Sequence, residues 1–226
     1  MNVLVVAAHP DDEVLGCGGT IAAHARRGDE VCVLLLAEGV TSRHARTSSA
    51  GRRELARLHA AAGKANRLLG VKQLVLQKFP DNRMDSVPLL EVVRAIEAVM
   101  RAFPPDVVYT HHARDLNVDH RIAHQAVNTA CRPLPGHTAR TLLYFEVQSS
   151  TDWQPAAAAA LFAPDWYRDI SATLRLKLMA LRAYAGEMRP WPHARSLEGA
   201  EALARVRGAT VGVKAAEAFV LGRHLA

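Results

Sequence analysis

Two short segments of the sequence concentrate side chains that can bind a metal ion or carry a proton. Residues 9–13 read His-Pro-Asp-Asp-Glu and place one imidazole beside three carboxylates. Residues 111–120 contain three histidines and end in Asp119 and His120. Imidazole nitrogens and carboxylate oxygens are common ligands of catalytic zinc, which usually takes three from the protein and leaves one position for water. The two segments therefore indicate a metal-dependent hydrolytic site.

Within these segments, His9, Asp12 and His120 form a candidate set of three metal ligands. Asp11 would then lie beside the metal without binding it, where a general base for an activated water is expected. Taken alone, residues 9–13 could equally be a solvated turn or a helix start, because the helix dipole favours carboxylates there. The second cluster favours the metal site. His124, one helical turn after His120, is an alternative ligand, although such a histidine more often packs.

The elements that must position these segments are strands and helices in alternation. Continuous apolar runs predict strands buried on both faces, and amphipathic stretches that end at glycine or proline predict helices. The predicted strands are residues 3–8, 30–37, 73–77, 106–111 and 140–147, and the predicted helices are residues 18–27, 48–69, 88–103, 119–131, 170–185 and 197–208. This order predicts an α/β fold: a Rossmann-like three-layer αβα sandwich with a mostly parallel sheet, in one domain over residues 1–226.

Both polar segments follow predicted strands, the first and the fourth. In open α/β sheets, ligands bind outside the carboxyl ends of the strands. The two clusters would therefore meet at one edge if these strands are parallel neighbours. The glycines at positions 16, 18 and 19 do not match the dinucleotide-binding fingerprint, because three carboxylates intervene and position 21 is isoleucine. We expect these glycines to allow close packing at a helix start.

Composition narrows the function classes. The formal net charge is +6, but arginine is scattered along the chain and aromatic residues make up only 5%, so we expect no nucleic-acid partner. A small anionic substrate accounts for the charge equally well. Three cysteines without close pairing argue against a disulfide framework. No signal peptide and no apolar run of membrane-spanning length is evident, which predicts a cytoplasmic protein without a membrane span and leaves a homo-oligomer open.

The residues around the two clusters resemble the LmbE-like family of zinc N-deacetylases, relatives of N-acetylglucosaminyl-phosphatidylinositol de-N-acetylase (PIG-L). The resemblance rests on residues 8–21 and 110–121, and extends to residues 80–85, 144–151 and 187–196. It implies that His9, Asp12 and His120 bind Zn²⁺. Fe²⁺ or Co²⁺ could occupy the same ligands. It also implies that Asp11 is the general base and that Asp119 is the acidic residue beside the last ligand.

One position departs from several family members, which have a histidine three residues before the final ligand. This chain has Asn117 there. An asparagine can donate a hydrogen bond to an oxyanion but cannot deliver a proton. Two candidates for the general acid therefore stay open: Asp11, which could return the proton that it takes, and a histidine from elsewhere in the chain, such as His193.

The resemblance implies a hydrolase that removes the acetyl group from an N-acetylated amino-sugar conjugate of the N-acetylglucosaminyl type, with zinc-activated water as the nucleophile. Expected substrate contacts are Arg43 and Arg83, in loops after the second and third predicted strands, and His193 and Arg195, in a proline-punctuated segment that could fold over the site. Arginine forks suit sugar hydroxyls, carboxylates and phosphates. Two alternatives remain. One is an amidase that cleaves a larger sugar or thiol conjugate, and the other is a metal-dependent sugar-binding protein without turnover.

Overall fold

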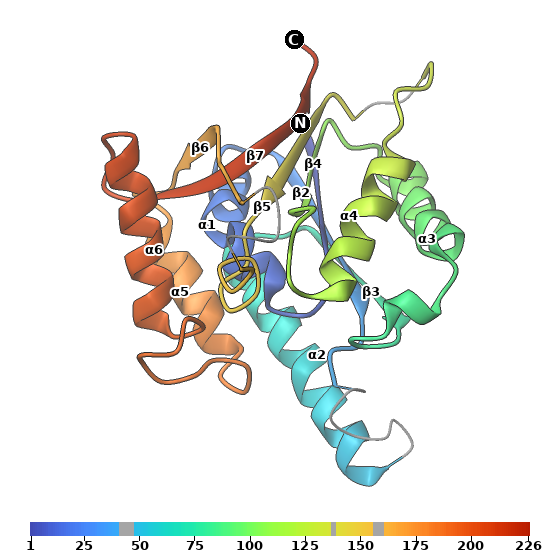
Figure 1. Cartoon of the computed structure of the whole chain (residues 1–226), viewed down its shortest axis with the longest axis horizontal. Coiled ribbons are helices and arrows are strands. Elements are labelled where there is room, and N and C mark those ends of the chain that lie inside the picture. Colours follow the sequence, from blue (N-terminus) through green and yellow to red (C-terminus); the bar gives the residue numbers. More distant parts are fainter. Residues whose placement is uncertain (41–47, 137–138, 156–160) are drawn as a thin grey trace.

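A seven-stranded sheet runs through the centre of the computed structural model, which describes residues 1–40, 48–136, 139–155 and 161–226 (Figure 1). The strands are β1 (Asn2–Ala7), β2 (Glu30–Ala37), β3 (Gln73–Phe79), β4 (Val107–His111), β5 (Thr141–Phe145), β6 (Trp166–Asp169) and β7 (Ala216–His224). Their order across the sheet is β3-β2-β1-β4-β5-β7-β6. The first five strands are parallel, and β7 is antiparallel to both β5 and β6. The predicted α/β fold with a mostly parallel sheet is therefore confirmed.

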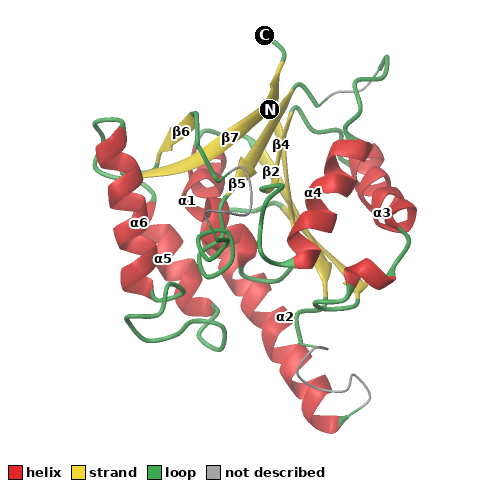
Figure 2. Ribbon diagram, in the orientation of Figure 1, coloured by secondary structure: helices red, strands yellow, loops and turns green. Residues whose placement is uncertain are grey.

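Helices cover both faces of the sheet (Figure 2). They are α1 (Asp12–Arg26), α2 (Ser49–Leu69), α3 (Leu89–Ala102), α4 (Val118–Ala130), α5 (Leu174–Ala183) and α6 (Leu197–Thr210), with a short 3₁₀ turn, η1 (Met84–Ser86). Helices α3 and α4 lie on one side, and α1, α2, α5 and α6 lie on the other. Among the described residues, no helix combines the length and the apolar character that crossing a bilayer requires.

Strand β1 shows why its sequence is apolar at every position. Val3 and Val5 pack in the core cluster that contains residues of α1, α2 and α5. Leu4 and Val6 point to the opposite face and pack with residues of α3 and α4. Successive side chains of a strand alternate between faces, so a strand covered on both sides needs an unbroken apolar run.

Strands β6 and β7 were not predicted from the sequence. Along β7 the exposure increases after Phe219, and β6 has no fully buried residue. Neither strand carries a long continuous apolar run, which was the criterion used to find the buried parallel strands. Antiparallel strands near a sheet edge are covered on fewer sides and leave a weaker signal.

Helix α1 starts six residues earlier than predicted and is kinked at Cys17 (φ −147°, ψ 26°). The predicted start near Gly18 corresponds to the segment after the kink. Gly16 confirms the expected role of the glycines, because a Cβ atom there would lie 2.3 Å from Cδ2 of Phe145. The kink also frees backbone N–H groups in the middle of the helix, since the normal i to i−4 bonding is interrupted there.

Glu217 on β7 accepts these freed N–H groups. Its carboxylate lies 2.9 Å from Gly19 N and 2.7 Å from Thr20 N. Lys177 on α5 donates to the same carboxylate at 2.6 Å and to the carbonyl oxygen of Leu15 at 2.8 Å. Both charged side chains are buried. Glu217 therefore ties the kinked helix, α5 and the antiparallel end of the sheet together.

We expect Glu217→Ala to lower the free energy of unfolding by about 3–5 kcal/mol, because Lys177 would be left as a buried and unpaired charge. Urea denaturation of the purified chain measures this. The matched control is Glu201→Ala, which breaks an exposed pair with Arg205 and should cost less than about 1 kcal/mol. Equal midpoints for the two variants would contradict a structural role for Glu217.

Candidate functional site

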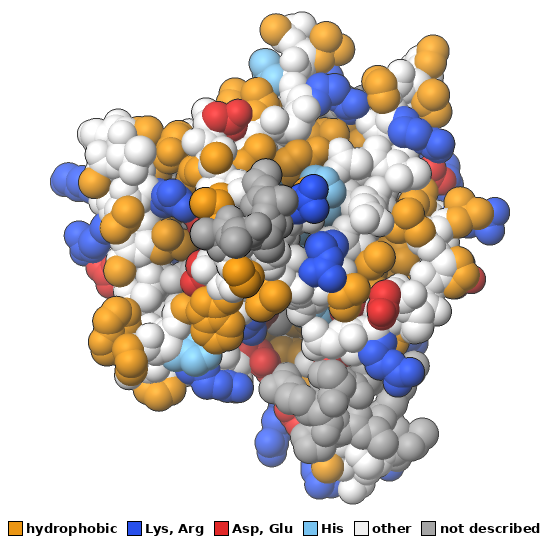
Figure 3. All heavy atoms as spheres, viewed as in Figure 1, with side chains coloured by type: hydrophobic (Ala, Val, Ile, Leu, Met, Phe, Trp, Pro, Cys, Tyr) orange, Lys and Arg blue, Asp and Glu red, His pale blue; other side chains and the backbone are white. Residues whose placement is uncertain are grey.

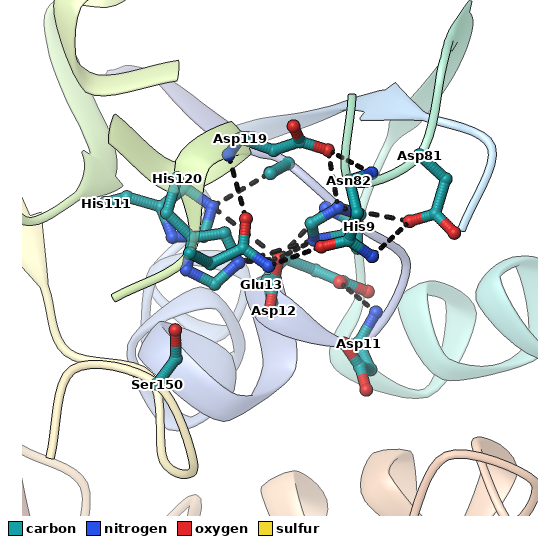
Figure 4. Close-up of polar contacts among 12 residues, drawn as sticks. His9, Asp11, Asp12, Glu13, Asp81, Asn82, His111, Asp119, His120 and Ser150 are labelled. Atoms are coloured by element: carbon teal, nitrogen blue, oxygen red, sulfur yellow. Dashed lines mark hydrogen bonds and ion pairs between the residues drawn. The ribbon is translucent and has the colours of Figure 1, made fainter. Parts of the chain in front are cut away.

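A polar cavity of about 220 Å³ opens at the carboxyl ends of the parallel strands. Some of its walls come from the segments that follow β1, β3, β4 and β5 (Figure 4). Another wall comes from the segment between α5 and α6. The lining residues are His9, Pro10, Asp11, Asp12, Gly39, Asp81, Asn82, Asn117, His120, Ser149, Ser150, Glu187 and Arg195. The fold thus brings the two predicted clusters to one place, because β1 and β4 are parallel neighbours.

Asp12 lies between two histidines at the centre of this cavity. Its Oδ2 is 3.0 Å from His120 Nε2 and 3.2 Å from His9 Nδ1, and it also accepts the backbone N–H of His9. The potential ligand atoms of His9, Asp12 and His120 all lie within 4.8 Å of one another. The other carboxylate oxygen, Asp12 Oδ1, is buried and has no hydrogen-bond partner among the described residues.

A buried carboxylate oxygen without a partner is costly, and a bound cation would remove that cost. The donor set of two imidazoles and one carboxylate is also the type that catalytic zinc and related divalent metals take. The residues that are present therefore fit a divalent metal ion.

Electrostatics at these residues favours a positive charge. Burial on its own would raise the pKa of Asp12, but His120 and His9 hold it well below its usual range. Burial opposes protonation of His9, yet hydrogen bonds to Asp119 and Asp12 raise its pKa to about 10. His120 behaves similarly: burial lowers its pKa, and Asp12 and Asp115 raise it to about 9. A metal ion would supply the positive charge that protons supply in its absence.

Two other triplets have ligand atoms equally close together, but their carboxylates have internal partners. In the triplet of His111, Asp115 and His120, the carboxylate of Asp115 accepts from the hydroxyls of Ser150 and Thr151. His111 Nε2 accepts the backbone N–H of Ala8 at 2.8 Å. The geometry thus gives this triplet a structural role in orienting His120.

The third triplet consists of His9, Asp81 and Asp119. The carboxylate of Asp119 accepts the backbone N–H groups of Asn82 (2.7 Å) and Met84 (2.9 Å), and it lies 2.9 Å from His9 Nε2. Asp119 therefore fixes the segment after β3 and the ring of His9. In metal sites, a carboxylate that binds the second nitrogen of a ligand histidine typically orients that histidine.

Asn117 is placed at the start of α4 as its N-cap. Its Oδ1 accepts the backbone N–H of Asp119, and its Nδ2 donates to Oδ1 of Asn82, both at 2.8 Å. Capping by asparagine satisfies one of the free N–H groups of a helix start. Because an amide nitrogen carries two hydrogens, one donor of Asn117 is left for a ligand in the cavity that it lines.

Asp11 is held in a strained backbone conformation, with φ 115°. Within the described chain, the non-glycine residues with positive φ are Asp11, Asn82 and Ser149, and all three line the cavity. Such conformations cost of order 1–3 kcal/mol each and cluster at functional sites. Three strained residues around one cavity indicate that these backbone conformations serve a function there, because they lower stability.

The carboxylate of Asp11 faces Arg195, with 3.0 Å between Oδ2 and Nη1. Arg195 also donates from Nε to the hydroxyl of Ser149 at 3.1 Å. Burial raises the pKa of Asp11 to about 8, and Arg195 opposes this rise. The contact between Arg195 and Asp11, which are 184 positions apart, was not expected from any sequence pattern.

Glu13, the third carboxylate of the first cluster, holds the backbone of Asp11 in place through buried hydrogen bonds. Its oxygens accept from the Tyr184 hydroxyl (2.7 Å), from Asn66 Nδ2 (3.0 Å) and from the backbone N–H of Asp11 (3.0 Å). Burial raises the pKa of Glu13 to about 7, and the hydrogen bond from Tyr184 opposes this. Glu13 thus anchors Asp11 to α2 and α5.

Of the four residues expected to contact the substrate, one lines the cavity within the described part of the chain. Arg195 lines the cavity. Arg83 is exposed and His193 packs against the ring of Trp153, and neither belongs to the cavity lining in the described structure. Arg43 lies outside the described residues. Glu187 was not singled out individually from the sequence, and it lines the cavity near Arg195.

Comparison with known proteins gives a consistent result. The family model for GlcNAc-PI de-N-acetylase (PIG-L) matches residues 4–131. A protein named uncharacterized deacetylase YaiS, from Escherichia coli K12, is 30% identical over 139 residues, which are 59% of this chain and 70% of that protein. A probable N-acetyl-alpha-D-glucosaminyl L-malate deacetylase 2 from Bacillus anthracis is 25% identical over 82% of this chain and 81% of its own length.

A solved structure shares the fold. The N,N'-diacetylchitobiose deacetylase from Pyrococcus horikoshii superposes with a TM-score of 0.77 at 22% identity, covering 98% of this chain and 84% of that one. The arrangement of strands and helices is thus common to both molecules.

If His9, Asp12 and His120 form the ligand set, Asp12→Ala and His120→Ala should weaken binding of Zn²⁺ by more than about 100-fold, beyond the 10- to 100-fold typical of losing a supporting residue. Metal content after dialysis and competition with a chelator measure this. The matched control is Asp81→Ala, which removes a carboxylate near His9 and should keep one metal per chain. Full metal content in Asp12→Ala would refute the assignment.

Proposed function

The chain belongs to the GlcNAc-PI de-N-acetylase (PIG-L) family of deacetylases, and on that premise we propose that it is a zinc-dependent hydrolase that removes the acetyl group from an N-acetylglucosaminyl-type conjugate. The observation that carries the proposal is the buried carboxylate of Asp12, whose Oδ2 lies within 3.2 Å of His9 and His120 and whose Oδ1 has no partner among the described residues. A second carboxylate, Asp11, lines the same cavity. A cation that activates water beside a carboxylate base is one established arrangement for hydrolysing an amide.

His9, Asp12 and His120 would hold the metal ion, which when bound polarises the amide carbonyl and activates water. Asp119 Oδ2 lies 2.9 Å from His9 Nε2 and Asp115 Oδ1 lies 3.1 Å from His120 Nδ1, so these two carboxylates keep the imidazole rings in place. Asp119 is in this reading a positioning residue, because it touches His9 rather than the substrate.

Asp11 performs the proton transfers. Its carboxylate takes a proton from water as the water oxygen attacks the amide carbon. When the C–N bond breaks, Asp11 returns this proton to the departing nitrogen, so that acetate and a free amine are formed. This cycle needs no separate acid, which agrees with the presence of Asn117 where several relatives of this type have histidine.

Arg195 and Asn117 act around this centre. Arg195 fixes one oxygen of Asp11 at 3.0 Å and leaves the other for water. The second amide hydrogen of Asn117 is available to the oxyanion that develops on the acetamide carbonyl. The small polar cavity suits the acetamido end of a sugar, and Ser149 and Glu187 add hydrogen-bonding groups for its hydroxyls.

Replacing Asp11 by asparagine should lower kcat about 10²–10⁴-fold, because the variant lacks a base while its shape is retained. The assay is the release of amine from N-acetylglucosamine conjugates by the zinc-loaded protein. Zinc content is measured on the same samples and should be unchanged. Normal turnover by Asp11→Asn would remove Asp11 from the mechanism. Zinc-loaded wild-type protein that binds these conjugates and releases no amine would favour a sugar-binding protein.

A further inference from the structure

A second and larger cavity adjoins the candidate active site. It has a volume of about 530 Å³, within the usual range of small-molecule pockets, whereas the site cavity of about 220 Å³ is smaller than that range. Glu187 lines both cavities, so the two spaces lie next to each other at this residue. A conjugate whose acetamido sugar enters the small cavity must place its remaining part outside it, and the larger cavity is the adjoining space.

One wall of the larger cavity is a single face of α2. Its residues recur at intervals of three and four, which puts them on one side of a helix. They are Ala50, Arg53, Glu54, Arg57, Leu58 and Ala61. The opposite wall is the end of α5 and the segment that follows it, residues 183–187. The cavity is thus a groove between two helices, and its central part is apolar because Leu58 and alanines line it.

The charged groups of the groove favour an anion. Arg53 and Arg57 are exposed and have no ion pair within the described chain, and Glu54 and Glu187 both have interaction partners. In the space-filling view, Lys and Arg side chains occur at the lower end of the molecule, where the first half of α2 projects (Figure 3). Two guanidinium groups one helical turn apart can bind a carboxylate or a phosphate, because their planar forks match these groups.

The groove is also connected to the catalytic segment through buried contacts. Tyr184, which lines the groove, donates its hydroxyl to Glu13 at 2.7 Å. Glu13 in turn accepts the backbone N–H of Asp11 at 3.0 Å. A ligand held along the groove would therefore contact a residue that is linked by two hydrogen bonds to the candidate base.

We propose that this groove binds the non-sugar part of the conjugate, and that Arg53 and Arg57 select an aglycone that carries an apolar linker and a terminal carboxylate or phosphate. The inference rests on the proposed deacetylase function and adds the substrate class to it. The small cavity fixes the acetamide, and the groove determines which conjugates bind well.

The test compares four substrates with the full-length, zinc-loaded protein. Three are N-acetylglucosamine conjugates with linkers of equal length that end in a carboxylate, a phosphate or an uncharged hydroxyl, and the fourth is methyl N-acetylglucosaminide. Arg53→Ala combined with Arg57→Ala should raise KM about tenfold for an anionic conjugate, with kcat unchanged, because two exposed charge contacts together are worth about one factor of ten. The carboxylate and phosphate arms identify which anion the groove prefers.

A second variant tests the groove without altering charge. Gly186 lines the groove, and a Cβ atom there would meet nothing within 4 Å, so Gly186→Trp adds a bulky side chain at the groove wall without a backbone clash at its Cβ. It should raise KM for all three extended conjugates and leave the methyl glycoside unaffected. The matched control for the double arginine variant is Arg67→Ala, which removes an exposed arginine at the far end of α2 and should leave KM and kcat unchanged for all four substrates.

The outcomes separate the two proposals. One outcome would overturn the groove inference and keep the deacetylase function. In it, the methyl glycoside is turned over, and charged and uncharged conjugates have equal KM values in both the wild-type protein and the double arginine variant. An equal rise in KM for all four substrates would also overturn it, since the arginines would then hold the sugar. No amine release from any substrate by the wild-type protein would overturn the proposed function, and the inference with it.

Discussion

The parallel pairing of β1 with β4 is the contact on which the candidate site depends. Val3, Leu4 and Val5 pair with residues 107–109, and this places the ends of the two strands side by side. The backbone N–H of Ala8 continues the connection by donating to His111. As a result, the segment that contains Asp12 and the helix that contains His120 start from adjacent points, although 108 positions separate the two residues in the sequence.

This arrangement explains which parts could be predicted from the sequence. Unbroken apolar runs revealed the parallel strands, and the rule that ligands bind at their carboxyl ends predicted that His9, Asp12 and His120 would meet if the first and fourth strands were parallel neighbours. The sheet fulfils this condition, which the sequence itself did not establish. Strands β6 and β7 could not be found in this way because they are only partly buried.

Contacts between distant loops could not be predicted in the same way. Arg195 reaches Asp11 from the far end of the chain, and Tyr184 and Asn66 meet at Glu13. Such contacts depend on how α2, α5 and the last loop pack on the sheet, and no periodicity of the sequence encodes them. The same packing creates the groove between α2 and α5 and holds Asp11 at φ 115°, so the strain at the cavity is supported by the surrounding buried network.

The proposed metal site consists of His9, His120 and the carboxylate of Asp12, with Asp11 beside it as the base. The most direct measurement is a crystal structure of the zinc-loaded protein with anomalous diffraction recorded at the zinc absorption edge. We expect one strong peak about 2.0–2.2 Å from a nitrogen of His9, a nitrogen of His120 and a carboxylate oxygen of Asp12, with Asp11 outside direct coordination. A peak held instead by Asp81 and Asp119, or the absence of any peak in the cavity, would contradict it.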